Sequence, residues 1–128
     1  MKKIKRPGSW LTKRVRRGFR GYPIATVAFY GPTADLATKI AVAVIPDEGN
    51  QPDLVERWFS DGTDIRHDPV IGDKVSGFLR QNNIRSVVVA DGILGCPHEE
   101  GVDYQEGTSC PKCPYWAGRD RFTHERIQ

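Results

Sequence analysis

The pattern of apolar positions predicts two strands in the first half of the chain. Residues 24–30 are rich in β-branched and aromatic side chains, which favour the pleated surface of a sheet. Gly31 and Pro32 follow directly and predict a turn, since this segment lacks the glycine spacing of a phosphate-binding loop. Residues 40–45 form the second predicted strand.

The second strand has apolar residues on both faces. Ile40, Val42 and Val44 point one way, and the two alanines at 41 and 43 point the other way together with Ile45. Such a pattern is typical of a strand that is covered on both sides. We therefore expect a helix to approach closely over the alanine face.

Two helices are predicted after this strand. Residues 51–59 carry Pro52 in a first turn and an apolar stripe at helical spacing. The second helix has a stronger start signal, because Asp68 can cap the N-terminus and Pro69 suits the first helical position. Its apolar stripe runs to a predicted end near Asn82 and Asn83.

A short valine-rich segment, residues 86–90, is the third predicted strand. The succession of strand two, helix and strand three predicts a crossover between parallel strands. We expect Asp91 and Gly92 to form an ordinary turn after it. The fold class is therefore α/β (or α+β): a small three-stranded mixed sheet with two helices and a metal loop that resembles a zinc knuckle near the C-terminus.

The charge of the chain divides it into a basic arm, residues 1–22, and a single domain, residues 23–128. The net charge is only +3, but residues 1–21 hold nine cations and no acid, which leaves the rest at −6. Two glycines interrupt the arm, so it is expected to be flexible or partly helical, with a short helix over residues 9–17. Such asymmetry indicates contact with a nucleic acid or another anionic surface.

The arm supplies the predicted nucleic-acid contacts, because cations neutralise phosphates and aromatic rings stack on unpaired bases. Residues 17–22 are similar in style to RGG-type RNA-binding segments, and RNA is favoured over DNA. An anionic membrane surface, an acidic protein partner or the acidic body of the same chain remain alternatives for the arm. The predicted contact residues are Lys2, Lys3, Lys5, Arg6, Trp10, Lys13, Arg14, Arg16, Arg17, Phe19 and Arg20.

No segment predicts a membrane span or an export signal. The longest purely aliphatic run is residues 40–45, far shorter than the ~20 residues that cross a bilayer. No apolar segment of the kind found in secretory signals follows the basic arm. We expect a cytoplasmic protein.

All three cysteines lie in residues 96–113 and point to a metal site. Cys110 and Cys113 form a Cys-Pro-Lys-Cys turn, in which two thiolates can converge on one ion, and Cys96 with His98 completes a set of four. An odd number of cysteines fits metal binding better than disulfides. The sequence predicts a structural Zn²⁺ held within residues 95–116. The fourth ligand stays open, because Glu99, Asp103, His67 or His124 could replace His98.

Two loose resemblances give alternative centres. Cys96-x-His98 followed by Cys110-x-x-Cys113 is similar to the Rieske pattern, with Cys113 in place of the second histidine, and implies an iron–sulfur cluster. His98-x-Glu100 followed by Cys110-x-x-Cys113 resembles zinc nucleobase deaminases. That likeness implies a catalytic zinc with Glu100 as the proton shuttle.

The most economical hypothesis is a non-enzymatic zinc protein that contacts RNA. The arm supplies affinity, and Tyr115, Trp116, Arg119 and Arg121 supply a second contact beside the metal. The alternatives are a small metalloenzyme that uses Glu99 or Glu100 at the edge of the third strand, and a protein–protein adaptor that docks through its acidic body. The sequence leaves the substrate, pathway and oligomeric state open.

Overall fold

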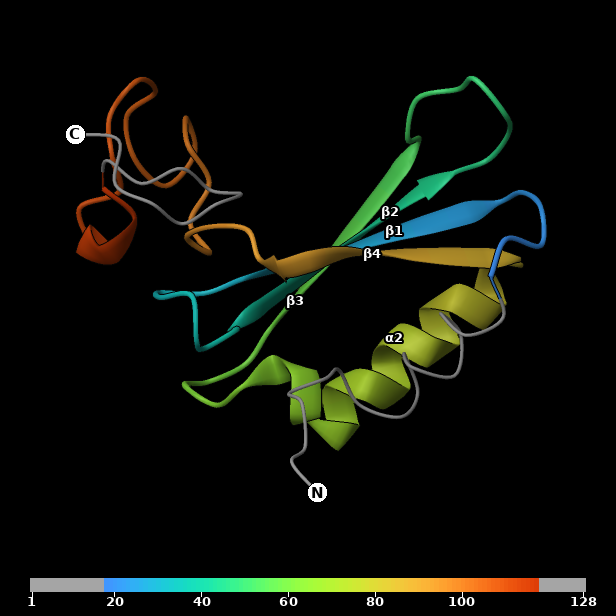
Figure 1. Ribbon diagram of the computed structural model, residues 1–128, viewed down its shortest axis with the longest axis horizontal. Helices are drawn as coiled ribbons and strands as arrows, with labels where there is room; N and C mark the ends of the chain where they lie inside the picture. The colour runs from blue at the N-terminus through green and yellow to red at the C-terminus, as the bar shows by residue number, and fades with distance from the viewer. Residues whose placement is uncertain (1–17, 118–128) are drawn as a thin grey trace.

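Four strands and one α-helix make up the part of the protein that the computed structural model describes, residues 18–117 (Figure 1). There are also two short 3₁₀ turns: η1 lies between β3 and α2, and η2 lies near the end of the described residues. The elements are β1 (Ile24–Tyr30), β2 (Lys39–Ile45), β3 (Leu54–Phe59), η1 (Ile65–His67), α2 (Pro69–Gln81), β4 (Ser86–Ile93) and η2 (Pro114–Trp116). The predicted helix at residues 9–17 lies outside the described residues.

The strands form one mixed sheet in the order β3-β2-β1-β4. β2 is antiparallel to both β1 and β3, and β1 is parallel to β4. The general prediction of a mixed sheet is confirmed, but the sheet has four strands and not three. The predicted crossover is wrong, because β1 separates β2 from β4 and these two strands run in opposite directions. The helix connects β3 to β4, which lie at opposite edges.

The missed strand is β3, where a helix was predicted. Ala41 pairs with Arg57 and Ala43 with Val55, so this segment adds a third antiparallel strand to the sheet. Trp58 turns toward the core and packs edge-on against Phe78 of α2. The apolar pairs of this segment fit a helical stripe and a strand about equally well, and long-range pairing with β2 decides between them.

The single α-helix among the described residues is the one with the clear start signal. The Asp68 carboxylate accepts hydrogen bonds from the backbone N–H groups of Val70 and Ile71, at 2.9 and 3.1 Å. These are two of the donors that a helix N-terminus leaves without partners. The helix ends at Asn82, as predicted, and buries Ile71, Val75 and Leu79.

The core lies between α2 and one face of the sheet. That face carries Val27 and Phe29 of β1, and Ile40, Val42 and Val44 of β2. Figure 1 shows α2 along one side of the sheet, with the segment after β4 at the far end of the sheet, on the side away from the helix. The predicted helix over the alanine face is therefore wrong, because Ala41 and Ala43 belong to the half-exposed face that α2 does not cover.

Backbone hydrogen bonds join the end of β1, near Gly31, to the segment after β4. The N–H of Gly31 donates to the carbonyl of Gly95, and that of Leu94 donates to the carbonyl of Phe29. A Cβ atom on Gly31 would lie 1.6 Å from the carbonyl oxygen of Leu36, so only glycine fits this turn. β4 runs on to Ile93 past its predicted end, with an irregular register opposite β1 and a positive φ at Gly92. The turn predicted at residues 91–92 is thus a bulge within the strand.

Within residues 18–117, no helix is both long and apolar enough to span a bilayer.

Candidate metal centre

The four predicted metal ligands lie in the segment that follows β4. Cys96 and His98 come from its first loop, and Cys110 and Cys113 come from the tight turn that precedes η2. The ligand atoms of these four residues all lie within 4.8 Å of one another. The two cysteines of the second turn are buried, and Cys96 and His98 are half-buried.

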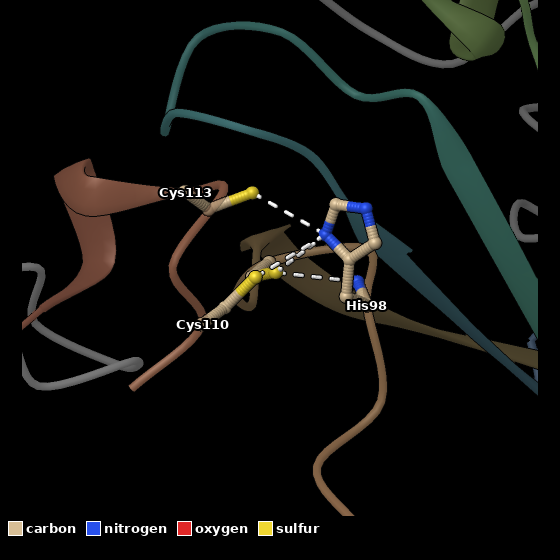
Figure 2. A group of neighbouring side chains, drawn as sticks. His98, Cys110 and Cys113 are labelled. Carbon is tan, nitrogen blue, oxygen red and sulfur yellow. Dashed lines mark hydrogen bonds between the residues drawn. The ribbon is translucent and has the colours of Figure 1, made fainter. Parts of the chain in front are cut away.

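The three sulfur atoms surround one nitrogen of the imidazole. The distances from Nδ1 of His98 to the Sγ atoms of Cys96, Cys110 and Cys113 are 3.2, 3.4 and 3.5 Å. Figure 2 shows the Cys110 and Cys113 side chains directed at the same edge of the His98 ring. A neutral imidazole carries at most one hydrogen on this nitrogen, so hydrogen bonding does not account for three sulfur neighbours.

This arrangement fits the coordination shell of a single metal ion. Tetrahedral zinc with ordinary Zn–S and Zn–N bonds places a ligand sulfur and a ligand nitrogen about 3.5 Å apart. The observed sulfur–nitrogen distances lie at or slightly below this value. None of the three cysteines forms a disulfide. The cluster could therefore hold a metal ion through three sulfurs and one nitrogen.

Backbone hydrogen bonds shape the two turns that carry the ligands. The N–H of His98 donates to the Sγ atom of Cys96 over 3.2 Å, and the N–H of Cys113 donates to the carbonyl of Cys110. An N–H group that donates to sulfur stabilises the thiolate over the thiol. The His98 N–H group thus offsets part of the effect of burial on the Cys96 thiol.

The thiols of the cluster have shifted pKa values. Burial raises the pKa of Cys96, against the lowering effect of the His98 N–H group, and burial likewise raises the pKa of Cys113. Burial also acts to raise the pKa of Cys110, but hydrogen bonds from the Lys112 backbone and from neighbouring thiols outweigh it and lower that pKa. Three thiolates in one small volume repel each other, so a cation among them would be strongly favoured.

A buried lysine joins the first ligand loop to the sheet. Lys39 is the first residue of β2, and only 4% of it is exposed. Its Nζ atom donates to the carbonyl of Pro97 and to Oε2 of Glu99, each over 3.0 Å. The rings of Tyr30 and Phe59 lie 5.3 and 5.6 Å from this ammonium group, within the range of cation–π attraction. Lys39 thereby holds the loop between Cys96 and Glu99 against the end of the sheet.

A tryptophan fixes the other end of residues 95–117, the segment that carries the four candidate ligands and is called the metal segment below. Nε1 of Trp116, in η2, donates to the carbonyl of Gly31 over 2.8 Å, and the ring packs against the core. Tyr115 meets this ring edge-on, with 5.1 Å between the ring centres. These two residues were predicted to pack beside the metal and to supply a second RNA contact. Trp116 packs against the core and Tyr115 packs against Trp116, whereas the RNA contact stays a proposal.

The carboxylates near the cluster form hydrogen bonds and ion pairs with groups other than the three cysteines. Glu99 forms ion pairs with Lys39 and Arg57, and the hydrogen bond from Lys39 is the main reason that the pKa of Glu99 lies below its usual value. Glu100 accepts a hydrogen bond from the N–H of Gly107, and Asp103 accepts one from the N–H of Glu99. Within the described residues it is therefore His98, and not Glu99 or Asp103, that joins the three cysteines.

The more distant histidines are not part of the cluster as described. His67 belongs to η1 and is exposed, and His124 lies outside the described residues. The four ligand atoms meet around one point, whereas a Rieske centre needs one ligand pair for each of two irons. A catalytic zinc keeps an open position, which the fourth protein ligand would fill here.

Most of the predicted nucleic-acid contacts cannot be placed. Phe19 and Arg20 are described and both are exposed, Phe19 by 68%. The backbone N–H of Arg20 donates to Oγ of Ser86, and that hydroxyl donates to the carbonyl of Gly21, so the end of the arm is fixed at the start of β4. The remaining predicted contacts lie outside the described residues: Lys2, Lys3, Lys5, Arg6, Trp10, Lys13, Arg14, Arg16, Arg17, Arg119 and Arg121.

The sequence did not predict that Lys39 and Arg57 position the loop that carries Cys96 and His98. Both residues lie in strands, and neither is part of a recognisable sequence motif. They form ion pairs with Glu99 only because β2, β3 and the metal segment are neighbours in the folded chain. A lysine at the first position of an apolar strand is the one available signal, and it does not identify a partner.

Comparison of this chain with protein-family models, with curated proteins and with solved structures finds no match.

Proposed function

We propose that Cys96, His98, Cys110 and Cys113 hold one structural Zn²⁺, in a protein that contacts RNA through its basic arm. The observation that carries the metal proposal is the convergence of three sulfur atoms on Nδ1 of His98. Four protein ligands leave no position for a substrate, which favours a structural ion over a catalytic one. The unpaired cysteines also fit a reducing compartment such as the cytoplasm.

Metal analysis of two His98 variants tests the zinc proposal. Purified protein should contain one zinc per chain, with no iron and no visible absorbance. His98→Cys keeps four donors and should retain the zinc, whereas His98→Ala should lose most of it because one ligand position is empty. Bound iron with visible absorbance, or equal zinc in both variants, would contradict this assignment.

The RNA proposal rests on the charge distribution. Nine cations without an acid lie in residues 1–21, while the rest of the chain is acidic. RNA phosphates would be drawn to the arm and repelled by the body, so the arm would define where the strand binds. The exposed Phe19 ring beside Arg20 adds a surface on which an unpaired base can stack.

A matched pair of charge variants tests this contact. Replacing Arg14 and Arg16 by Gln removes two arm cations, and replacing Lys74 and Arg80 by Gln removes two exposed cations of α2. If the arm binds phosphates, only the arm variant should make the negative slope of log K against log salt shallower, by about 1.4 for single-stranded RNA. Equal effects of the two variants on a fluorescent RNA oligonucleotide would refute a specific role of the arm.

A further inference from the structure

The face of the sheet that α2 leaves uncovered is hollow at its centre. Thr26 of β1 pairs with Ala43 of β2, and Ala28 pairs with Ala41, so four short side chains lie together on this face. All four are only half-buried. Larger residues flank them on the same face, since Ala43 pairs with Val55 on β3 and Ala41 pairs with Arg57. We call this floor and its walls the sheet hollow.

The metal segment forms one wall of the sheet hollow. Tyr104, Ser109, Cys110 and Trp116 line it from that segment, together with the floor residues of β1 and β2. The pocket is open to solvent on one side and also extends beside Cys96 and His98; its volume is about 770 Å³, within the range of roughly 300–1,000 Å³ that is typical of small-molecule sites. The fixed position of Trp116, whose indole N–H is bound to Gly31, keeps this wall in place.

The charges around the sheet hollow are already compensated. Lys39 and Arg57 are both paired with Glu99, and Glu100 accepts a hydrogen bond from its own loop. A phosphate or a carboxylate would therefore have to displace Glu99 from two cations. An uncharged ligand with polar edges fits this environment better, because the Thr26 and Ser109 hydroxyls can meet such edges.

The floor has the size and shape of a nucleobase. Neighbouring strands lie about 4.8 Å apart, and residues two apart on one strand lie about 6.8 Å apart. The four Cβ atoms of Thr26, Ala28, Ala41 and Ala43 thus mark a flat rectangle of about 5 by 7 Å, comparable to the face of one base. Two aromatic side chains from the metal segment, Tyr104 and Trp116, line the same pocket and can contact such a ring.

We propose that the sheet hollow binds an unpaired nucleobase. As a site for bound RNA, this inference rests on the proposed contact between the arm and the phosphates. The charges assign a different part of the RNA to each site. The basic arm neutralises the phosphates of the RNA backbone, and the sheet hollow, whose charged side chains are paired, binds a planar, uncharged base. The metal centre then has a second consequence, because it holds one wall of the base site in position.

The test compares an RNA octamer of adenines with an abasic octamer of the same length, both carrying a fluorescent label. The two probes share their phosphates, so the arm contributes equally to both. Full-length protein should bind the adenine octamer at least about fivefold more tightly, the lower end of what one stacked base provides. Ala41→Leu and Ala43→Leu fill the hollow and should abolish this preference. Val70→Leu, which adds bulk to an exposed position of α2 on the opposite side of the sheet, should leave it unchanged.

The outcomes separate the hollow from the arm. Equal, salt-sensitive binding of both octamers would uphold the arm contact and overturn the base site. Loss of the preference in Val70→Leu as well, or its survival in both alanine variants, would also overturn the base site. Zinc content and far-ultraviolet circular dichroism establish that each variant is folded.

If neither octamer binds, the RNA contact itself is wrong, and free adenosine then decides about the hollow. Adenosine should shift the backbone amide resonances of Thr26, Ala28, Ala41 and Ala43 in the full-length protein. Such shifts would uphold a base site that serves a free nucleoside. Unchanged resonances would overturn it.

Discussion

Nζ of Lys39 lies 3.0 Å from Oε2 of Glu99, although the two residues are 60 positions apart in the chain. The same ammonium group binds the Pro97 carbonyl, so one buried side chain joins β2 to the loop that carries Cys96 and His98. The position of the candidate metal centre on the sheet therefore depends on a residue that is not one of the four proposed ligands.

Replacement of Lys39 by Met should loosen this loop. Met keeps much of the apolar stem between Tyr30 and Phe59 but leaves the Pro97 carbonyl and the Glu99 carboxylate without their donor. We expect a loss of about 1–3 kcal/mol in the free energy of unfolding, measured by urea denaturation, together with weaker zinc retention. Lys74→Met, on the exposed face of α2, is the control and should change stability by less than about 0.5 kcal/mol. Equal stability of the two variants would argue against the anchoring role of Lys39.

Removal of the metal should unfold the metal segment and leave the sheet intact. All the buried residues of the main hydrophobic cluster lie in residues 25–93, and Trp116 is the one member of the metal segment packed against it. Hydrogen exchange after addition of a chelator should show loss of protection in residues 95–117, with protection of β1, β2 and α2 retained. His98→Cys loaded with zinc is the matched control. Global loss of protection would contradict this separation.

Gly31→Ala should be strongly destabilising. The added methyl group would fall 1.6 Å from the Leu36 carbonyl oxygen, and Gly31 also supplies both of its backbone groups to the metal segment. We expect a loss of about 3 kcal/mol or more, measured by chemical denaturation. Gly95→Ala serves as the comparison, because no atom lies within 4 Å of its added Cβ position. A small effect at Gly31 would mean that the turn can move without disturbing β1 or the metal segment.

Asp64 should stabilise the fold in a pH-dependent way. Burial acts to raise the pKa of its carboxyl, but the hydrogen bonds and charge of Arg66 outweigh burial and lower it below 3.8. Because the folded pKa is depressed, this stabilisation is present above the unfolded value and is lost as the pH falls through the folded one. Asp64→Asn, which can still cap η1, should lose about 1 kcal/mol at pH 7 and progressively less toward pH 3.

The measurement is the difference in unfolding free energy between the original protein and Asp64→Asn across this pH range. Asp73→Asn, an exposed position of α2, controls for general effects of acid. A difference that stays constant with pH would show that the ion pair between Asp64 and Arg66 contributes little.

Local signals determined the parts of the fold that need no distant partner. Asp68 and Pro69 mark the start of α2, and β-branched residues mark β1 and β2, because caps and side-chain stiffness act within a few residues. The four candidate metal ligands were identifiable for the same reason: their spacing along residues 96–113 is enough to suggest convergence.

Only the tertiary structure decided what depends on residues far apart in the chain. The strand at Leu54–Phe59 exists because β2 offers it an unpaired edge, and the order of strands excludes the crossover that their succession suggests. The small side chains of Ala41 and Ala43 predicted a face on which a helix packs closely. Instead, α2 packs on the opposite face of the sheet, and the two alanines form part of the floor of the sheet hollow. The sequence determined which residues could bind a metal, since short-range chemistry suffices for that. The tertiary structure decided which face of the sheet stayed uncovered and which lysine contacts the metal segment. Both depend on contacts between segments that are far apart in the sequence.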